Sequence, residues 1–241
     1  MNFPKKGRSL AKLRLFSSSD ASSVAAADSV AVIGLGRFGR ALALELMANG
    51  TEVLGIDADE SIVQELNGQL THVVCADSTR EEVLQQLAVP EFDRVVVAIG
   101  SDIQASILTT SLLLRFHVEH VWAKAVSDAH GTILEQLGVG HVIYPEKEMG
   151  RRVAHLVRGS MQDYLEIGDG FSLVTMAPPA GIVGMALGES RVRSTAGVTI
   201  TAVRPHNGTW THTDENTVIA ADDTILVSGP TSKAEAFSLR R

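Results

Sequence analysis

Short apolar runs alternate with segments of helical periodicity over the first 145 residues. The apolar runs predict buried strands at residues 30–33, 52–57, 72–76, 94–99, 120–125 and 141–144. Between them, apolar positions at helical spacing predict helices at residues 38–49, 60–70, 80–87, 103–116 and 128–137. Because strands and helices alternate with short connections, we expect an α/β fold: a Rossmann-like, doubly wound parallel sheet with helices on both faces.

The pattern changes after Pro145. Residues 146–162 predict one longer helix, a connector that also offers a packing face to another subunit. Its apolar positions fall at helical spacing: Met149, Val153, Leu156 and Val157. Short strands follow at residues 171–176, 198–204, 217–220 and 224–228, and a last helix begins near Thr231 and Ser232. The predicted domains are a tail (1–27), the parallel-sheet domain (28–145), the connecting helix (146–164) and a small α+β domain (165–241).

The tail differs from the rest of the chain in composition. It carries five basic side chains before a Ser- and Ala-rich stretch: Lys5, Lys6, Arg8, Lys12 and Arg14. This composition is typical of a disordered basic tail, and an organellar transit peptide is the alternative. A basic tail can also contact an anionic membrane or a loop of a partner.

Charge and cysteine content narrow the function classes. The chain has 21 Lys and Arg against 28 Asp and Glu, so we expect no nucleic-acid partner. The sequence contains no apolar run of about 20 residues that would span a membrane. Its single cysteine, Cys75, excludes an internal disulfide and favours a reducing cytoplasm. Because Cys75 lies in an apolar run, we expect it to be a small core residue.

A glycine motif follows the first predicted strand. Gly34, Gly36 and Gly39 form G-x-G-x-x-G between that strand and the first helix. The first glycine permits a tight turn, the second lets a phosphate approach the backbone, and the third lets helix and strand pack closely. Asp57 ends the second strand at the spacing of the acid that binds ribose hydroxyls. The motif therefore predicts a nucleotide site, and the carboxylate of Asp57 disfavours a 2′-phosphate.

Other residues follow strands at the same edge of the predicted sheet. Asp59 either contacts the ribose edge or caps the next helix. Asp77 and Ser78 either contact an adenine ring or cap the helix at residue 80. We also expect the backbone after the fourth strand to line the pocket, at Ala98, Ile99 and Gly100.

Two cations bear on the kind of ligand. Arg37 and Phe38 lie between the second and third glycines, and we count both as ligand contacts. A guanidinium at a phosphate loop can pair with a terminal phosphate, so Arg37 favours a ligand with more charge than NAD, such as ATP. Lys124 ends the fifth strand and is either a phosphate partner or a surface lysine.

Catalytic signatures do not appear in the sequence. A dehydrogenase needs a substrate domain and an acid or base beside the nicotinamide, but only a helix and a small domain follow Tyr144. No histidine pair has metal-ligand spacing, and His155 alone is better explained as a packing or surface residue. We therefore expect a site that senses its ligand, catalytic residues being absent; a small NAD-dependent oxidoreductase and an NADH redox-sensing module are the alternatives.

Three blocks of the sequence resemble a known family. They are residues 30–39, residues 97–100 with 103–106, and residues 144–150, and the last reads Tyr-Pro-Glu-Lys-Glu-Met-Gly. In this order and spacing they resemble RCK (also called KTN) domains, found in the cytosolic regulatory subunits of Ktr/Trk potassium uptake systems. The resemblance covers residue 28 to the end of the chain.

This resemblance implies a function. Members form dimers that assemble into an octameric ring beneath a membrane potassium-translocating subunit, of the KtrB or TrkH kind, at the inner face of the membrane. ATP favours the active ring, ADP the inactive one, and NAD or NADH binds the same pocket in some members. Arg37 matches the arginine that reaches a terminal phosphate, and Asp57 matches the ribose acid. Glu146 matches a glutamate that a Mg or Ca ion can bridge to the phosphates, in a helix that crosses between subunits.

The last domain resembles the TrkA-C domain. In some relatives, a dimer of this domain binds cyclic di-AMP between apolar residues and an arginine. Arg193 aligns with that arginine, whereas Gly188 stands where a bulky apolar residue is typical. Cyclic di-AMP is therefore a second, weaker ligand expectation.

Overall fold

The computed structural model describes residues 29–240. The expected disordered tail lies outside these residues. The chain divides into two compact units, Met1–Pro145 and Glu146–Arg241, which are described separately below.

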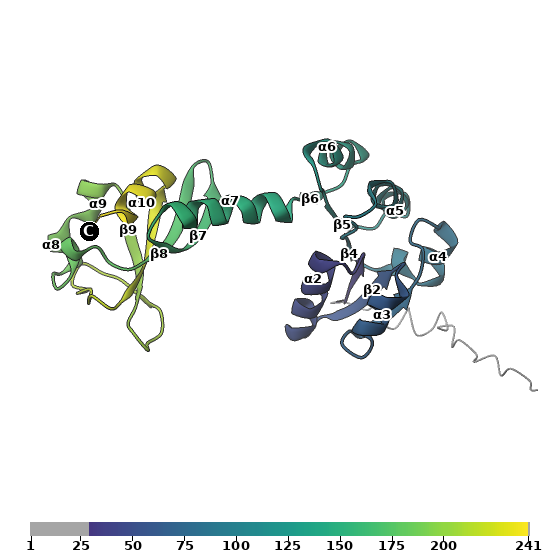
Figure 1. The fold of residues 1–241 in the computed structure, drawn as a ribbon, viewed down its shortest axis with the longest axis horizontal. Helices are drawn as coiled ribbons and strands as arrows, with labels where there is room; N and C mark the ends of the chain where they lie inside the picture. Colours follow the sequence, from purple (N-terminus) through teal and green to yellow (C-terminus); the bar gives the residue numbers. More distant parts are fainter. Residues whose placement is uncertain (1–28, 241) are drawn as a thin grey trace, which may run out of the picture. The chain divides into compact units, whose positions relative to one another are not determined.

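The first unit is a parallel sheet with helices on both faces (Figure 1). Its six strands pair in the order β3-β2-β1-β4-β5-β6, every neighbouring pair being parallel. They are β1 (Ser29–Ile33), β2 (Glu52–Asp57), β3 (His72–Cys75), β4 (Arg94–Val97), β5 (His120–Lys124) and β6 (His141–Ile143). The helices are α2 (Arg37–Ala48), α3 (Glu60–Leu66), α4 (Glu81–Gln86), α5 (Ile103–Arg115) and α6 (Asp128–Leu137), with a 3-10 turn η1 (Val89–Glu91). The predicted doubly wound sheet is confirmed, and its order reverses between β1 and β4, where such folds bind ligands.

Two apolar layers hold this sheet in place. Ala31 and Ile33 of β1 pack into the layer beneath α4, α5 and α6. Val30 and Val32 pack into the opposite layer, beneath α2 and α3. Because alternate residues of a strand face opposite sides and both sides are covered, β1 is buried along its whole length. The end of β1 is therefore a fixed point for the loop that follows it.

The second unit is a small α+β domain. After α7 (Pro145–Arg158), five strands form an antiparallel sheet in the order β10-β9-β11-β8-β7. They are β7 (Met161–Gly168), β8 (Phe171–Met176), β9 (Thr199–Arg204), β10 (Thr211–His212) and β11 (Thr224–Pro230). The helical segments after α7 are η2 (Ala180–Ile182), α8 (Leu187–Ser190), α9 (Val192–Ala196) and α10 (Thr231–Ser238). One apolar cluster, which includes Tyr164, Ile225 and Phe237, joins this sheet to its helices.

Three sequence-based expectations about elements are wrong. The connecting helix ends at Arg158, before Gly159, and residues 161–168 form β7 because they pair with β8. Residues 217–220 form no strand: Val218 and Ile219 make only isolated bridges. Cys75 is exposed because β3 is an edge strand.

Exposure of Cys75 does not make its thiol acidic. Burial of the thiol and the negative charges of Glu60, Asp57 and Asp59 raise its pKa above the model value of 9.0. Among the described residues, no helix combines the length and apolarity needed to cross a membrane.

Candidate functional site

The glycine motif forms a tight loop between β1 and α2. Gly34 has a φ of +91°, and a Cβ there would lie 2.8 Å from the backbone nitrogen of Ile99. A Cβ on Gly39 would lie 1.9 Å from the carbonyl oxygen of Gly34. Both positions therefore require glycine. A Cβ on Gly36 would meet nothing within 4 Å, so the space in front of this residue is open to a ligand.

The N-terminus of α2 faces this loop with unsatisfied backbone donors. Gly36 is its N-cap and has no side chain to bond them, and the first turn contains no acidic residue. Arg37, the first helical residue, is exposed, and within residues 29–240 it makes no hydrogen bond or ion pair. Free N–H groups, the positive end of the helix dipole and a guanidinium together suit an anionic ligand such as a phosphate.

The carboxylate of Asp57 is bonded directly to the glycine loop. Its Oδ2 accepts a hydrogen bond of 2.6 Å from the backbone N–H of Leu35, and its Oδ1 accepts one of 2.9 Å from the backbone N–H of Asp59. Each oxygen keeps a further lone pair for a ligand hydroxyl. The structure thus brings the predicted ribose acid beside the predicted phosphate loop, although 22 residues separate Asp57 from Leu35 in sequence.

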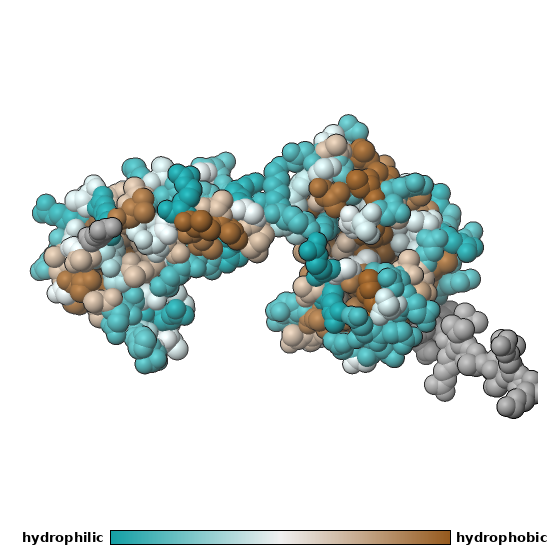
Figure 2. All heavy atoms as spheres, viewed as in Figure 1, coloured by the Kyte–Doolittle hydropathy of each residue, from teal (hydrophilic) through white to brown (hydrophobic). Residues whose placement is uncertain are grey.

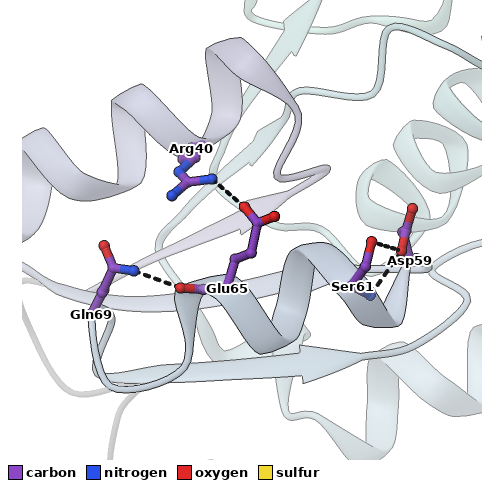
Figure 3. A network of polar contacts seen from close by, with 5 residues as sticks. All are labelled: Arg40, Asp59, Ser61, Glu65 and Gln69. Atoms are coloured by element: carbon purple, nitrogen blue, oxygen red, sulfur yellow. Dashed lines mark hydrogen bonds and ion pairs between the residues drawn. The ribbon is translucent and has the colours of Figure 1, made fainter.

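The two other aspartates of this edge make local contacts. Asp59 caps α3, because its Oδ1 accepts bonds from the N–H of Ser61 (2.8 Å) and from the Ser61 hydroxyl (2.6 Å), as Figure 3 shows. Asp77 accepts corresponding bonds from Thr79. In each case the side-chain bond from the hydroxyl is the main cause that lowers the pKa of the carboxyl. The helix-cap alternative holds for Asp59 but not for Asp77, since Arg80 is the N-cap of α4.

Ser78 is buried and faces the interior. Its hydroxyl lies 2.9 Å from that of Thr109, which is also buried, on α5. This contact fastens the loop after β3 to α5. The expected contact of Asp77 and Ser78 with an adenine ring remains a prediction.

The wall opposite the loop comes from the ends of β4 and β5. The buried Ala98 donates its N–H to the carbonyl of Ile33 at 2.7 Å, and Ile99 lies against Gly34. Lys124 is 8% exposed, so its alternative as a surface lysine is wrong. Its ammonium lies 3.2 Å from where a Cβ of Gly100 would stand.

Lys124 also connects this wall to the helix that begins at the loop. Its ammonium is 5.8 Å from the centre of the Phe38 ring. The structure therefore places Lys124 and Phe38 at the same edge as the glycine loop, as the sequence predicted for both residues.

A further contact near the loop was not anticipated from the sequence. Arg40, one turn after Arg37, forms an ion pair of 2.6 Å with Glu65 of α3, and Gln69 donates to the carbonyl of Glu65 (Figure 3). This network joins the helix after the glycine loop to the helix after β2. The two residues are 25 positions apart, and neither lies in a recognisable motif, so no sequence signal indicates the pair.

Comparisons with known proteins decide the family. The TrkA-N domain matches residues 30–145 and the TrkA-C domain matches residues 171–239. The chain is 37% identical to the Ktr system potassium uptake protein C of Bacillus subtilis, over 87% of this chain and 96% of that protein. It belongs to the Ktr potassium uptake protein family. It is also 34% identical to protein A of the same system, over 86% of this chain and 94% of that protein.

A solved structure shows the same fold as this Ktr family chain. The GsuK channel bound to NAD aligns with a TM-score of 0.60 at 18% identity. The alignment covers 85% of this chain and 38% of that one, so the Ktr family chain corresponds to less than half of the channel. The resemblance to the Ktr/Trk regulatory family is confirmed by the relatives, and the fold by this likeness.

Glu146 belongs to the second unit of the Ktr family chain. It lies in the first turn of α7, where an acidic side chain also suits the helix dipole. Among the described residues, no group of three His, Cys, Asp or Glu side chains is arranged to hold a metal ion. A metal ligand role for Glu146 therefore requires ligand phosphates to complete the coordination, and it stays a prediction.

A second cavity lies in the TrkA-C domain, beside α8 and α9. It has a volume of about 450 Å³, and its lining includes Arg191, Arg193, Asp214 and Glu215. Arg193 donates to the hydroxyl of Thr199 at 3.2 Å.

The backbone of Gly188 fixes one wall of this cavity. Its N–H donates to the carbonyl of Glu215 at 2.8 Å, and a Cβ on Gly188 would lie 3.2 Å from that oxygen. The contact explains why a bulky side chain is absent here. A ligand in this cavity meets two guanidinium groups and two carboxylates.

Proposed function

We propose that this protein is a nucleotide-sensing regulatory subunit of a potassium uptake system. In this role, ATP and ADP stabilise different shapes of an assembly that gates a membrane ion-translocating subunit. The relatives named as Ktr system potassium uptake proteins support the system. The observation that carries the sensing role is the open glycine loop with an exposed, unpartnered Arg37 at the start of α2.

The geometry favours a nucleotide with a terminal phosphate. The bridging phosphates of any dinucleotide can use the free N–H groups of α2, but Arg37 adds a forked donor pair beyond them. A guanidinium there makes more contacts with the triphosphate of ATP than with the diphosphate of ADP. A ligand shifts a conformational equilibrium only through such a difference in affinity for the two states.

A cation is part of this proposal because the first unit is acidic. Residues 29–145 contain six Lys and Arg against fifteen Asp and Glu. A polyanionic nucleotide is repelled by such a domain unless counter-charge accompanies it. A Mg or Ca ion between the phosphates and Glu146 supplies that charge, and both ions prefer oxygen ligands.

NAD or NADH is the second candidate ligand. The GsuK channel structure with a similar fold is bound to NAD, and Asp57 is placed to bind a ribose in either ligand. An NADH-responding module, or a small oxidoreductase, would follow from tight NAD binding. The relatives favour regulation over catalysis, because they are uptake proteins with no enzyme activity in their names.

Assembly into dimers and an octameric ring is proposed from exposed apolar surfaces. No residue of α7 is buried, and Met149, Val153 and Val157 on one of its faces are 53, 45 and 79% exposed. Such a stripe suits a second copy of the same helix. Figure 2 shows a further hydrophobic area over α5 and α6, which suits contacts between dimers. Its exposed apolar side chains are Ile103, Leu108, Ile133 and Leu137.

The remaining parts of the proposal concern location and a second ligand. We place the protein in the cytoplasm, peripheral to the inner face of the membrane, as a gating subunit requires. The cavity beside Arg193 is the proposed site for cyclic di-AMP, whose phosphates suit its two arginines. The domain limits given above, with α7 as a helix that crosses between subunits, belong to the same proposal.

The experiment that tests this function is purification of the full chain followed by native mass spectrometry. We expect an octamer that carries adenine nucleotide. A monomer that carries NAD, together with hydride transfer in a steady-state assay, would support the oxidoreductase instead.

A further inference from the structure

The β7–β8 hairpin ends in three exposed apolar side chains. Leu165, Ile167 and Phe171 are 54, 58 and 42% exposed. In the register of the two strands, Leu165 lies opposite Leu173, and Gly168 lies opposite Phe171, so the three side chains share one end of the hairpin. A cluster of this kind on a small domain indicates a surface that is covered in the working protein.

The other side of the hairpin is already covered. The His155 ring of α7 stacks on Tyr164 with 4.1 Å between ring centres, and Arg151 pairs with Glu166 at 3.0 Å. Helix α10 packs against β7 and β8 on the same side of the sheet. The exposure is therefore confined to the outer side and to the edge formed by β7.

Half of this edge is blocked by its own side chains. The backbone N–H of Tyr164 donates to Oδ1 of Asp163 at 2.7 Å, and the guanidinium of Arg152 holds that carboxylate. A blocked donor prevents pairing there, as edge strands commonly require. Beyond it, Leu165–Gly168 remains available, which leaves a short, apolar edge of the sheet.

The N-terminal segment of this chain has matching chemistry. Residues 13–16 read Leu-Arg-Leu-Phe and follow four further basic residues, and no acid occurs before Asp20. They lie outside the described residues, so their sequence alone carries this step. Asp169 at the hairpin turn is exposed and, within residues 29–240, makes no ion pair, so it offers a carboxylate to these cations.

We propose that residues 13–16 of this chain cover the outer side of the β7–β8 hairpin. Leu13 and Leu15 then lie against Leu165 and Ile167, and the basic side chains lie near Asp169. Twelve residues separate Phe16 from Ser29, which span up to about 40 Å when extended. A second copy of the hairpin is the competing occupant, but it would bring Asp169 close to its like-charged counterpart.

A disulfide trap in the full chain tests this contact. In a Cys75→Ser background, Leu15→Cys combined with Ile167→Cys should crosslink within one chain or between two chains, and either product supports the proposal. The matched control pairs Leu15→Cys with Leu239→Cys, because Leu239 is 61% exposed elsewhere in the same unit. Crosslinking no faster than this control overturns the proposal. So does efficient dimerisation of Ile167→Cys alone, which would assign the surface to a second copy.

Hydrogen exchange gives an independent readout. In the Leu13→Ser/Leu15→Ser variant of the full chain, the amides of residues 165–171 should exchange at least about threefold faster than in the unaltered protein. The control Leu10→Ser should leave them unchanged. Equal exchange in all three proteins contradicts the proposal, whether or not the protein binds nucleotide.

Discussion

Oδ2 of Asp57 accepts a hydrogen bond of 2.6 Å from the backbone N–H of Leu35, which lies inside the glycine loop. This bond makes the proposed ribose acid and the proposed phosphate loop one mechanical unit. A ligand that binds the carboxylate therefore also restrains the loop.

Replacing Asp57 by Asn should weaken nucleotide binding about 10- to 100-fold. The amide has one acceptor oxygen where the carboxylate has two, so the bonds to Leu35 and Asp59 cannot both persist, and a charged acceptor for the ribose is lost. Titration calorimetry with ATP and ADP measures the loss. Asp59→Asn is the control, because it retains an acceptor for Ser61; equal losses in the two variants would remove Asp57 from the site.

Replacing Gly39 by Ala should destabilise the first unit by about 2–3 kcal/mol or more, since the new Cβ would stand 1.9 Å from the oxygen of Gly34. Urea unfolding followed by circular dichroism measures the change. Gly140→Ala is the matched control, because a Cβ there meets nothing within 4 Å. Equal stability of the two variants would show that α2 does not pack so closely on the loop.

Acid should weaken the second unit through Asp163. The side-chain hydrogen bond from Arg152 holds the pKa of this carboxyl below its ordinary value of 3.8, aided by the N–H of Tyr164 and opposed by burial. The folded pKa is lower than the unfolded one. The stabilisation is therefore complete above the unfolded value and is lost as pH falls through the folded one.

The variant Asp163→Asn tests this pH dependence. Its deficit in unfolding free energy relative to the unaltered protein should shrink as urea unfolding is repeated from pH 7 to pH 3. Asp222→Asn, at an exposed turn, should show no such trend. A deficit for Asp163→Asn that stays constant over the whole range would refute the linkage.

Replacing Glu146 by Gln should reduce the dependence of ATP binding on a divalent cation, since the proposed ion loses a charged oxygen ligand. Calorimetry with ATP in Mg, in Ca and in chelator gives the ratio of affinities. Glu148→Gln is the control from the same helical turn. An unchanged ratio in Glu146→Gln would place the cation elsewhere.

Much of the first unit was predictable because its signals are local. The apolar runs, the helical spacing between them and the three glycines each lie within one segment, and together they gave the sheet, the loop and Asp57. The order of strands followed from general rules for alternating strands and helices.

Other features depend on partners that the sequence does not reveal. Residues 161–168 form a strand because β8 pairs with them, although the preceding helix has the stronger local signal. The contacts Ser78–Thr109 and Arg40–Glu65 join segments 31 and 25 residues apart. Cys75 is exposed because β3 is at the edge of the sheet, and an apolar run alone does not distinguish edge strands from central ones.

The central claim is that Arg37 reads the terminal phosphate of ATP. Titration calorimetry of the Arg37→Ala variant with ATP and with ADP tests it most directly, with Arg80→Ala as an exposed control from the same unit. We predict that Arg37→Ala weakens ATP at least about tenfold and ADP less than about threefold, because a hydrogen-bonded charge is lost only with the triphosphate. Equal losses for ATP and ADP would contradict the account.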